Sequence, residues 1–172
     1  MKKSFIIVSI VILVVIIFVV GAVIGIKQLI DKSDKDKLEK DEVAKISNIK
    51  SFYFSYSNGY AMNAYTRYEI NKVDGKYVSK IKQYGKSDEE AQIIEISEET
   101  VRELERILNK YEVTKWDGFK ESDQDVMDGD SFSCSIHMED GKNISASGYM
   151  VWPTHYRDVV SELDSFFLGI IK

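Results

Sequence analysis

One long apolar run lies near the start of the sequence. From Phe5 to Ile26 the only polar side chain belongs to Ser9, and no residue carries a charge. At about 1.5 Å rise per residue, a helix of this length is long enough to cross a hydrocarbon core of about 30 Å. The pattern therefore predicts a transmembrane signal anchor over residues 1–30.

The end of the apolar run is compatible with two outcomes, a cleaved signal peptide or a retained anchor. Gly21 and Ala22 resemble the small residues of a signal-peptide cleavage site, yet the run continues past them to Ile26, which favours a retained anchor. Gly21 and Gly25 also form a small-xxx-small motif, which is typical of membrane helices that approach closely. The motif is compatible with a homodimer through this helix face, and the alternative is that glycine is simply common in membrane helices.

The lysines on the two sides of the run favour opposite orientations. Lys2 and Lys3 favour a cytoplasmic N-terminus, whereas Lys27, Lys32 and Lys35 favour the reverse. Long domains are translocated largely regardless of flanking charge, and two lysines before a first apolar run are typical of an export signal. We therefore expect a single-pass protein of the cell membrane, with its N-terminus in the cytoplasm and its domain outside.

The rest of the chain divides into a spacer and a domain. Residues 31–46 are dense in charges of both signs and nearly free of aromatic side chains, which predicts a solvated spacer. Residues 47–172 are enough for one ordinary domain.

Alternation of apolar and polar side chains predicts strands in the first half of this domain. Residues 52–57, 62–70, 76–84 and 91–96 alternate in this way, and Asn58-Gly59 and Asp74-Gly75 are typical hairpin turns between them.

Helical spacing takes over at Ser97, which is a good N-cap. The apolar residues that follow, Val101, Leu104 and Leu108, recur on one helix face. The segment 112–129 shows no regular pattern.

The last part of the chain predicts a hairpin and a helix. Residues 132–138 and 144–150 alternate on either side of Asp140-Gly141, and a broad apolar helix face follows Trp152-Pro153. Strands in runs with helices at two places predict an α+β fold, an antiparallel sheet with two helices packed on one face.

Composition and net charge limit the kinds of molecule that the domain can bind. Hydrophobic residues make up 44% of the chain and charged residues 30%, a globular balance. The net charge is −5, and the three basic residues before Ile30 have no acidic counterpart there, so the domain is more acidic than the whole chain. Nucleic acid is a poor partner for such a domain, because its phosphates require a basic face.

The single cysteine, Cys134, lies on the apolar side of an alternating strand. One cysteine forms no disulfide within the chain and does not suggest a zinc site. We expect it to be part of the core.

The acidic loop 123–130 is the first candidate site. Its carboxylates, together with Gly129, suit a hard cation such as calcium, but the spacing departs from the EF-hand pattern and Met127 replaces an oxygen ligand. An acidic turn that leads into the next strand is the alternative. The candidate metal ligands are Asp123, Asp125, Asp128 and Asp130.

Tyrosines are the second candidate. Seven of the ten lie between Tyr53 and Tyr84, and those that face outward from a sheet would form a platform for sugar rings or a peptide. The alternative is that tyrosine is simply a good strand former at half-buried positions. The candidate ligand-binding residues are Tyr53, Tyr56, Tyr60, Tyr65 and Tyr68.

Motifs of catalysis are missing from the sequence. His137 and His155 have no spacing that supports a metal pair or a general base, and there is no Gly-x-Ser-x-Gly motif or glycine-rich phosphate loop. No cofactor is implied beyond the calcium considered above.

The second half of the chain resembles a known group of proteins. The residues that carry the resemblance are Asp128-Gly129-Asp130-Ser131-Phe132, Asp140-Gly141, the stretch Ile144 to Met150, and Pro153. They are similar to a family of uncharacterised exported or membrane-anchored proteins of Gram-positive bacteria, over about the last fifty-five residues. The resemblance implies a location in the bacterial cell envelope and supplies no activity and no catalytic residues.

These observations favour a membrane-anchored, extracytoplasmic binding or interaction module without enzymatic activity, with a protein or glycan partner in the envelope. One alternative is an envelope hydrolase that uses the acidic loop 123–130, with or without a metal. A second is an accessory subunit of a membrane complex.

Overall fold

The computed structural model describes residues 45–57, 64–123, 125, 126 and 128–171, all within a compact unit that spans Ala44–Lys172. The predicted anchor, most of the predicted spacer and Tyr60 lie outside the described residues. In the part of the chain that is described, no helix is both long and apolar enough to cross a membrane.

Seven strands and two long helices make up the described domain. Four strands come first, followed by the first helix: β1 (Ile49–Ser57), β2 (Tyr65–Val73), β3 (Lys76–Lys82), β4 (Gln92–Ile96) and α2 (Glu98–Lys110). A short 3₁₀ helix, three further strands and the second helix follow: η1 (Val113–Trp116), β5 (Lys120–Ser122), β6 (Ser131–Met138), β7 (Asn143–Tyr149) and α3 (Tyr156–Ile170). The predicted α+β class is confirmed.

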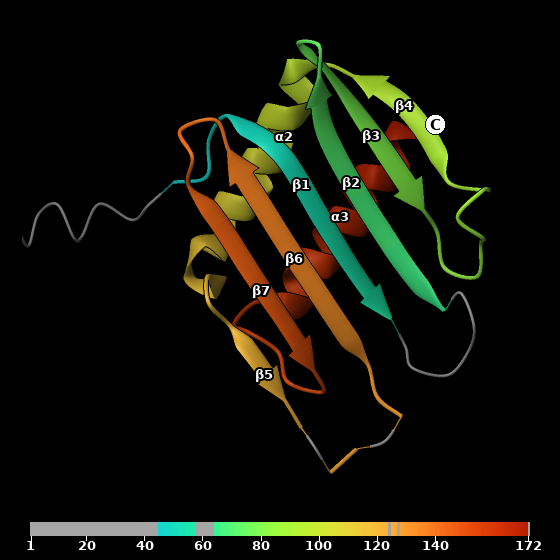
Figure 1. The fold of residues 1–172 in the computed structure, drawn as a ribbon, viewed down its shortest axis with the longest axis vertical. Coiled ribbons are helices and arrows are strands. Elements are labelled where there is room, and N and C mark those ends of the chain that lie inside the picture. The colour runs from blue at the N-terminus through green and yellow to red at the C-terminus, as the bar shows by residue number, and fades with distance from the viewer. Residues whose placement is uncertain (1–44, 58–63, 124, 127, 172) are drawn as a thin grey trace, which may run out of the picture. The chain divides into compact units, whose positions relative to one another are not determined.

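The sheet has the strand order β4-β3-β2-β1-β6-β7-β5 (Figure 1). Every neighbouring pair is antiparallel except β5 and β7, which run parallel. The prediction of a purely antiparallel sheet was therefore wrong at this edge. Strand β5 has three residues, all exposed, so it has no buried alternation that a sequence pattern would reveal.

Both helices cover the same face of the sheet, behind the strands in the view of Figure 1. Leu104 and Leu108 of α2 and Leu163 and Phe167 of α3 are buried there. They meet the apolar side of the strands, and the sheet residues in this core include Phe52, Phe54, Ile70, Ile81, Cys134 and Ile136. None of the described helices covers the opposite face of the sheet, which we call the open face.

Local sequence explains how the elements begin and turn. The Ser97 Oγ accepts a hydrogen bond from the Thr100 N–H at 3.1 Å, so the predicted N-cap is confirmed. Asp74 and Gly75 both have positive φ, 49° and 79°, as the two-residue hairpin turn requires. The last helix starts at Tyr156 instead of directly after Pro153, because His155 adopts a left-handed conformation with φ 62°.

Candidate functional site

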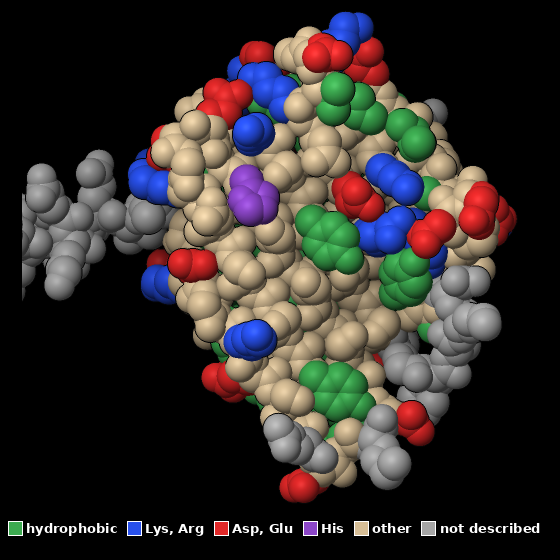
Figure 2. All heavy atoms as spheres, in the orientation of Figure 1, with side chains coloured by type: hydrophobic (Ala, Val, Ile, Leu, Met, Phe, Trp, Pro, Cys, Tyr) green, Lys and Arg blue, Asp and Glu red, His purple; other side chains and the backbone are tan. Residues whose placement is uncertain are grey.

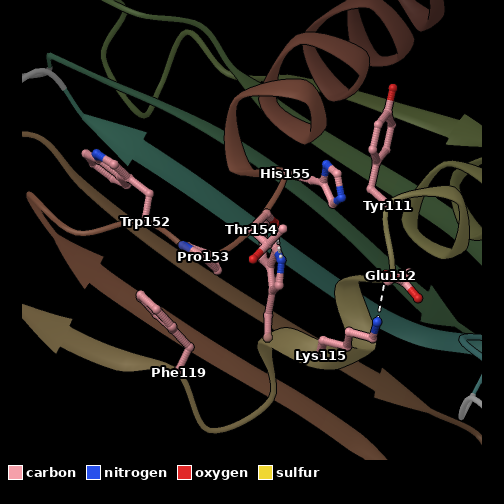
Figure 3. Close-up of a pocket in the computed structure, with 9 residues that line it drawn as sticks. Tyr111, Glu112, Lys115, Phe119, Trp152, Pro153, Thr154 and His155 are labelled. Carbon is pink, nitrogen blue, oxygen red and sulfur yellow. Dashed lines mark hydrogen bonds and ion pairs between the residues drawn. The ribbon is translucent and has the colours of Figure 1, made fainter.

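A cleft of about 300 Å³ lies between η1, the end of α2 and the residues that precede α3 (Figure 3). Segments that are far apart in the sequence form it, and both tryptophans of the chain are among its residues. We call it the aromatic cleft, and its lining residues are Tyr111, Glu112, Lys115, Trp116, Phe119, Trp152, Pro153, Thr154 and His155.

Trp116 fixes the base of the aromatic cleft. Its side chain is only 2% exposed, and its indole N–H donates to the carbonyl oxygen of Thr154 at 3.0 Å. The ring also packs edge-on against Phe132, with centroids 5.9 Å apart. Trp116 thus connects η1 to the residues before α3 and holds the two sides of the cleft in a fixed relation.

One side of the cleft is apolar. Trp152, Pro153 and Phe119 are each half-buried and lie on this side in Figure 3. The Trp152 ring stacks on that of Tyr156, with centroids 4.5 Å apart and an interplanar angle of 17°. Because the ring is supported by this stack, it offers a rigid apolar surface to a ligand.

The other side is polar and carries both signs of charge. The Lys115 Nζ lies 2.8 Å from the Glu112 carboxylate, and the His155 Nδ1 lies 3.4 Å from the Asp158 carboxylate. The Tyr111 hydroxyl donates to Glu162 at 3.0 Å. These pairs are solvent-accessible, so each contributes little to stability and can exchange partners with a ligand.

Two of the five described non-glycine residues with positive φ line the cleft. Glu112 and His155 both have positive φ, 52° and 62°, which is uncommon for residues other than glycine. Such a conformation costs on the order of 1–3 kcal/mol and persists where the surroundings enforce it, typically at functional sites. The two strained residues face the cleft from its two sequence segments.

A second hollow of about 220 Å³ adjoins the cleft at Trp152, which lines both. Its other residues come from β1, α3 and the start of β6, and they include Tyr56, Asp130, Tyr156 and Arg157. Trp152 therefore contributes surface to both the cleft and this hollow.

A tyrosine pair supports the second hollow from inside the domain. The hydroxyls of Tyr56 and Tyr68 both donate to the Asp164 carboxylate of α3, at 2.8 Å and 2.7 Å. Burial, with a further contribution from Asp164, raises the pKa of Tyr56 to about 12, and the same two causes raise the pKa of Tyr68. The pair stays protonated and ties the end of β1 to α3.

The open side of the sheet carries a patch of a different kind (Figure 2). Alternate residues of β1, β6 and β7 point away from the helices and lie side by side in the strand register. We call this patch the serine face. In β1 it consists of Ser51, Tyr53, Ser55 and Ser57; in β6 of Ser131, Ser133, Ser135 and His137; in β7 of Asn143, Ser145, Ser147 and Tyr149.

Strand alternation divides the predicted tyrosines between the two faces of the sheet. Tyr53 and Tyr65 lie on the open face, whereas Tyr56 and Tyr68 lie on the helix-covered face, and Tyr60 is outside the described residues. The Tyr65 hydroxyl donates to Asp88 at 3.1 Å. The predicted platform is thus not formed by the four described tyrosines together, and ligand binding by any of them stays a prediction.

The acidic loop is an exposed turn where it is described. Asp123, Asp125 and Asp128 are exposed, and the Asp123 Oδ1 accepts a hydrogen bond from the Asp125 N–H at 3.1 Å. Asp130 is half-buried and lines the second hollow. Among described residues there is no group of three or more His, Cys, Asp or Glu side chains that could hold a metal ion. Calcium binding stays a prediction.

The two histidines lie in different places. His137 is exposed on the serine face, beside Ser135 at 3.2 Å, whereas His155 lines the aromatic cleft. Cys134 is buried in the core as predicted, and burial raises the pKa of its thiol to about 12.

Sequence reasoning missed the cleft and the serine face. A signal existed for both: the two tryptophans flank irregular segments, and serine occupies the polar position of three strands repeatedly. In comparisons with known proteins, no family model matches the chain, and no curated protein shows significant sequence similarity to it.

Proposed function

We propose that the protein is a non-enzymatic binding module, anchored by residues 1–30 at the outer face of a membrane, that takes its ligand in the aromatic cleft. The observation that carries the proposal is the position of Trp152, a supported ring that lines both hollows.

The lining of the cleft supports ligand binding. Binding pockets are concave and mostly apolar, with a small number of polar groups that orient the ligand. Aromatic side chains held rigid by their neighbours lose little entropy on binding and contribute most of the energy of many interfaces. Trp152, Phe119 and Pro153 supply the apolar surface, and Glu112 and Lys115 supply the polar side.

The apolar side and the polar side of the cleft together indicate a class of ligand. A suitable ligand has an apolar or ring-shaped group next to hydrogen-bonding atoms, as a peptide side chain with its backbone or an acetylated sugar does. Paired charges of both signs at the rim favour a ligand without a large net charge, because a strongly charged ligand would displace one partner of each pair. Peptides and glycan fragments of the envelope both satisfy these conditions.

Intrinsic fluorescence provides the test, because both tryptophans of the sequence lie at the cleft. The full-length protein in lipid nanodiscs is titrated with short peptides that carry one aromatic or aliphatic side chain, and with N-acetylglucosamine oligomers. We expect a saturable change in emission with at least one probe. Phe119→Ala removes one ring from the cleft and should weaken that binding about tenfold, since one contacting ring is worth on the order of 1–2 kcal/mol.

Tyr84→Ala is the matched control, because Tyr84 is 53% exposed and does not line the cleft. It should bind like the parent protein. The proposal is contradicted if no probe changes the emission, or if Phe119→Ala and Tyr84→Ala weaken binding equally.

A further inference from the structure

The serine face is uncharged in a chain that is rich in charge. Charged residues make up 30% of the sequence, yet none of the twelve residues of the serine face is Asp, Glu, Lys or Arg, and the exposed Lys50 stands beside it at the start of β1. Strands β2 and β3 of the same sheet show the ordinary pattern, because they direct Arg67, Glu69 and Lys80 to the same side. Figure 2 shows the contrast: charged side chains gather over the β2–β3 half and along the margins.

Strand formation does not explain the serines. Strands favour β-branched and aromatic residues at their solvent-facing positions, and serine belongs to neither group. In the register of the sheet, Ser55 lies opposite Ser133, which in turn lies opposite Ser147. The next row of the same strands contains Tyr53, Ser135 and Ser145. Hydroxyls therefore recur across strands about 4.8 Å apart and along each strand at alternate residues.

Many of these hydroxyls are available for a ligand. Ser57 and Ser131 bond each other at 2.8 Å, and Ser135 bonds His137. Within the described residues, the side chains of Ser55, Ser133, Ser145 and Ser147 form no hydrogen bond to another side chain. All four are exposed or half-buried. Each serine hydroxyl can both donate and accept a hydrogen bond, so the face can bond to donors and to acceptors of a ligand.

The face also has a depression and aromatic rings. A hollow of about 320 Å³ lies along the β7 edge, lined by Ser133, Ser145 and Ser147 together with residues 117–120. The Asp117 carboxylate at its margin accepts from the Ser145 N–H at 3.0 Å, which fixes that margin against the sheet. Tyr53 and Tyr149 stand at different rows of the face and provide rings on which a sugar can stack.

From these features we infer that the serine face binds a neutral polysaccharide. An anionic or cationic polymer would require several charges of the opposite sign, whereas the serine face itself has no Asp, Glu, Lys or Arg, and its hollow is lined by one residue of each sign, Asp117 and Lys120. A second copy of the chain or another protein would require apolar area to bury, which short serine side chains do not supply. A neutral glycan presents repeated hydroxyls and apolar ring faces, and these match the repeated serines and the two tyrosines. This binding is separate from that of the aromatic cleft.

Co-sedimentation with insoluble neutral polysaccharides tests the inference. The full-length protein in detergent micelles is mixed with microcrystalline cellulose or with insoluble starch, and the bound fraction is measured by depletion of the supernatant. We expect saturable binding to at least one of them. Ser133→Lys and Ser145→Asp place a charge in the middle of the face, and each should weaken binding about tenfold or more, because an unpaired charge loses its hydration against a neutral ligand.

Two control variants separate this face from other surfaces. Ser161→Lys introduces a charge at an exposed position of α3, and Trp152→Ala removes the central ring of the aromatic cleft. Both should bind polysaccharide like the parent protein. Unfolding temperatures of all variants verify that the domain remains folded.

The outcomes divide cleanly. Loss of binding in Ser133→Lys and Ser145→Asp, with retention in both controls, supports the serine face as the site. The inference is overturned if neither polysaccharide binds the parent protein. Binding that survives both charged substitutions, or that is lost only in Trp152→Ala, also overturns it, and the latter result would assign the glycan to the cleft and leave the proposed function intact.

Discussion

At the scale of single residues, the Asp164 carboxylate is a polar contact that connects α3 to β1 and β2. Two tyrosine hydroxyls donate to it, and the Tyr68 ring also stacks on Phe167 with centroids 4.2 Å apart. Hydrogen bonds to a charged group contribute more to stability than hydrogen bonds between neutral groups. Removal of one tyrosine hydroxyl also leaves the carboxylate with fewer hydrogen bonds.

Tyr68→Phe keeps the ring and removes only the hydroxyl. We expect it to lower the free energy of unfolding by about 1–2 kcal/mol, measured by urea denaturation at pH 7. Tyr84→Phe, at an exposed position, should change it by less than about 0.5 kcal/mol. Equal stabilities of the two variants would show that the Asp164 contact contributes nothing.

The same tyrosines predict a loss of stability in base. The folded-state pKa of Tyr56 is about 12 and the unfolded value is 10.0, so the folded state binds the proton more tightly. Stability from this group is fully present below pH 10 and is lost as the pH rises through 12. The difference in unfolding free energy between the parent protein and Tyr56→Phe should therefore shrink as the pH rises from 10 to 12, and a difference that stays constant over this range would contradict the assignment.

Cys134 provides a chemical probe of the core. The thiol is buried, and its pKa is raised to about 12, so little thiolate forms at pH 8. We expect no reaction of the native protein with a thiol reagent over minutes at pH 8 and complete reaction in denaturant, measured by mass spectrometry. Rapid labelling of the folded protein would place the cysteine outside the core.

At the scale of elements, a segment was predictable from the sequence where its apolar and polar residues alternate regularly. The hairpin around Asp140-Gly141 was predictable because apolar residues such as Phe132 and Ile136 alternate without interruption. Strand β5 was not, because it is short and exposed and takes its conformation from the edge of β7. Helix α3 starts at Tyr156, two residues later than directly after Pro153, because His155 adopts a positive φ that the sequence pattern did not reveal.

Gly148 lies at a position of β7 that has no room for a side chain. A Cβ at this position would clash with the carbonyl oxygen of Val151 and would lie 2.5 Å from the ring of Phe132. Gly148→Ala should therefore destabilise the domain by about 1–3 kcal/mol in thermal or urea unfolding.

Gly169→Ala is the matched comparison for this substitution. A Cβ there meets nothing within 4 Å, and the position is helical, so we expect a gain of up to about 1 kcal/mol. A Gly148→Ala variant as stable as the parent would show that the strand and the Phe132 ring can separate at little cost.

At the scale of the whole molecule, the candidate sites were less predictable than the fold. The aromatic cleft combines residues 111–119 with residues 152–155, and only tertiary packing brings these segments together. The distribution of the tyrosines between the two faces of the sheet was not predicted, because strand alternation sends Tyr53 and Tyr56 to opposite faces, and ligand binding by them stays a prediction. The serine face required the register of three strands, which no single segment reveals.

Membrane orientation is a prediction about the whole chain. If residues 1–30 anchor the domain outside, protease added to intact cells should digest the domain, whereas a cytoplasmic marker protein should remain whole. A domain that is protected in intact cells and cut only after lysis would reverse the predicted orientation.

The central claim is that the aromatic cleft binds a ligand in the native membrane, and site-specific photo-crosslinking tests it most directly. A photoreactive amino acid replaces Lys115, an exposed residue at the rim of the cleft, or Lys86, an exposed residue that does not line it, and cells are irradiated before mass spectrometry. We predict a discrete adduct at position 115 that is absent at position 86 and is lost when Trp152→Ala is added. The same products at both positions, or an adduct that survives Trp152→Ala, would contradict binding in the cleft.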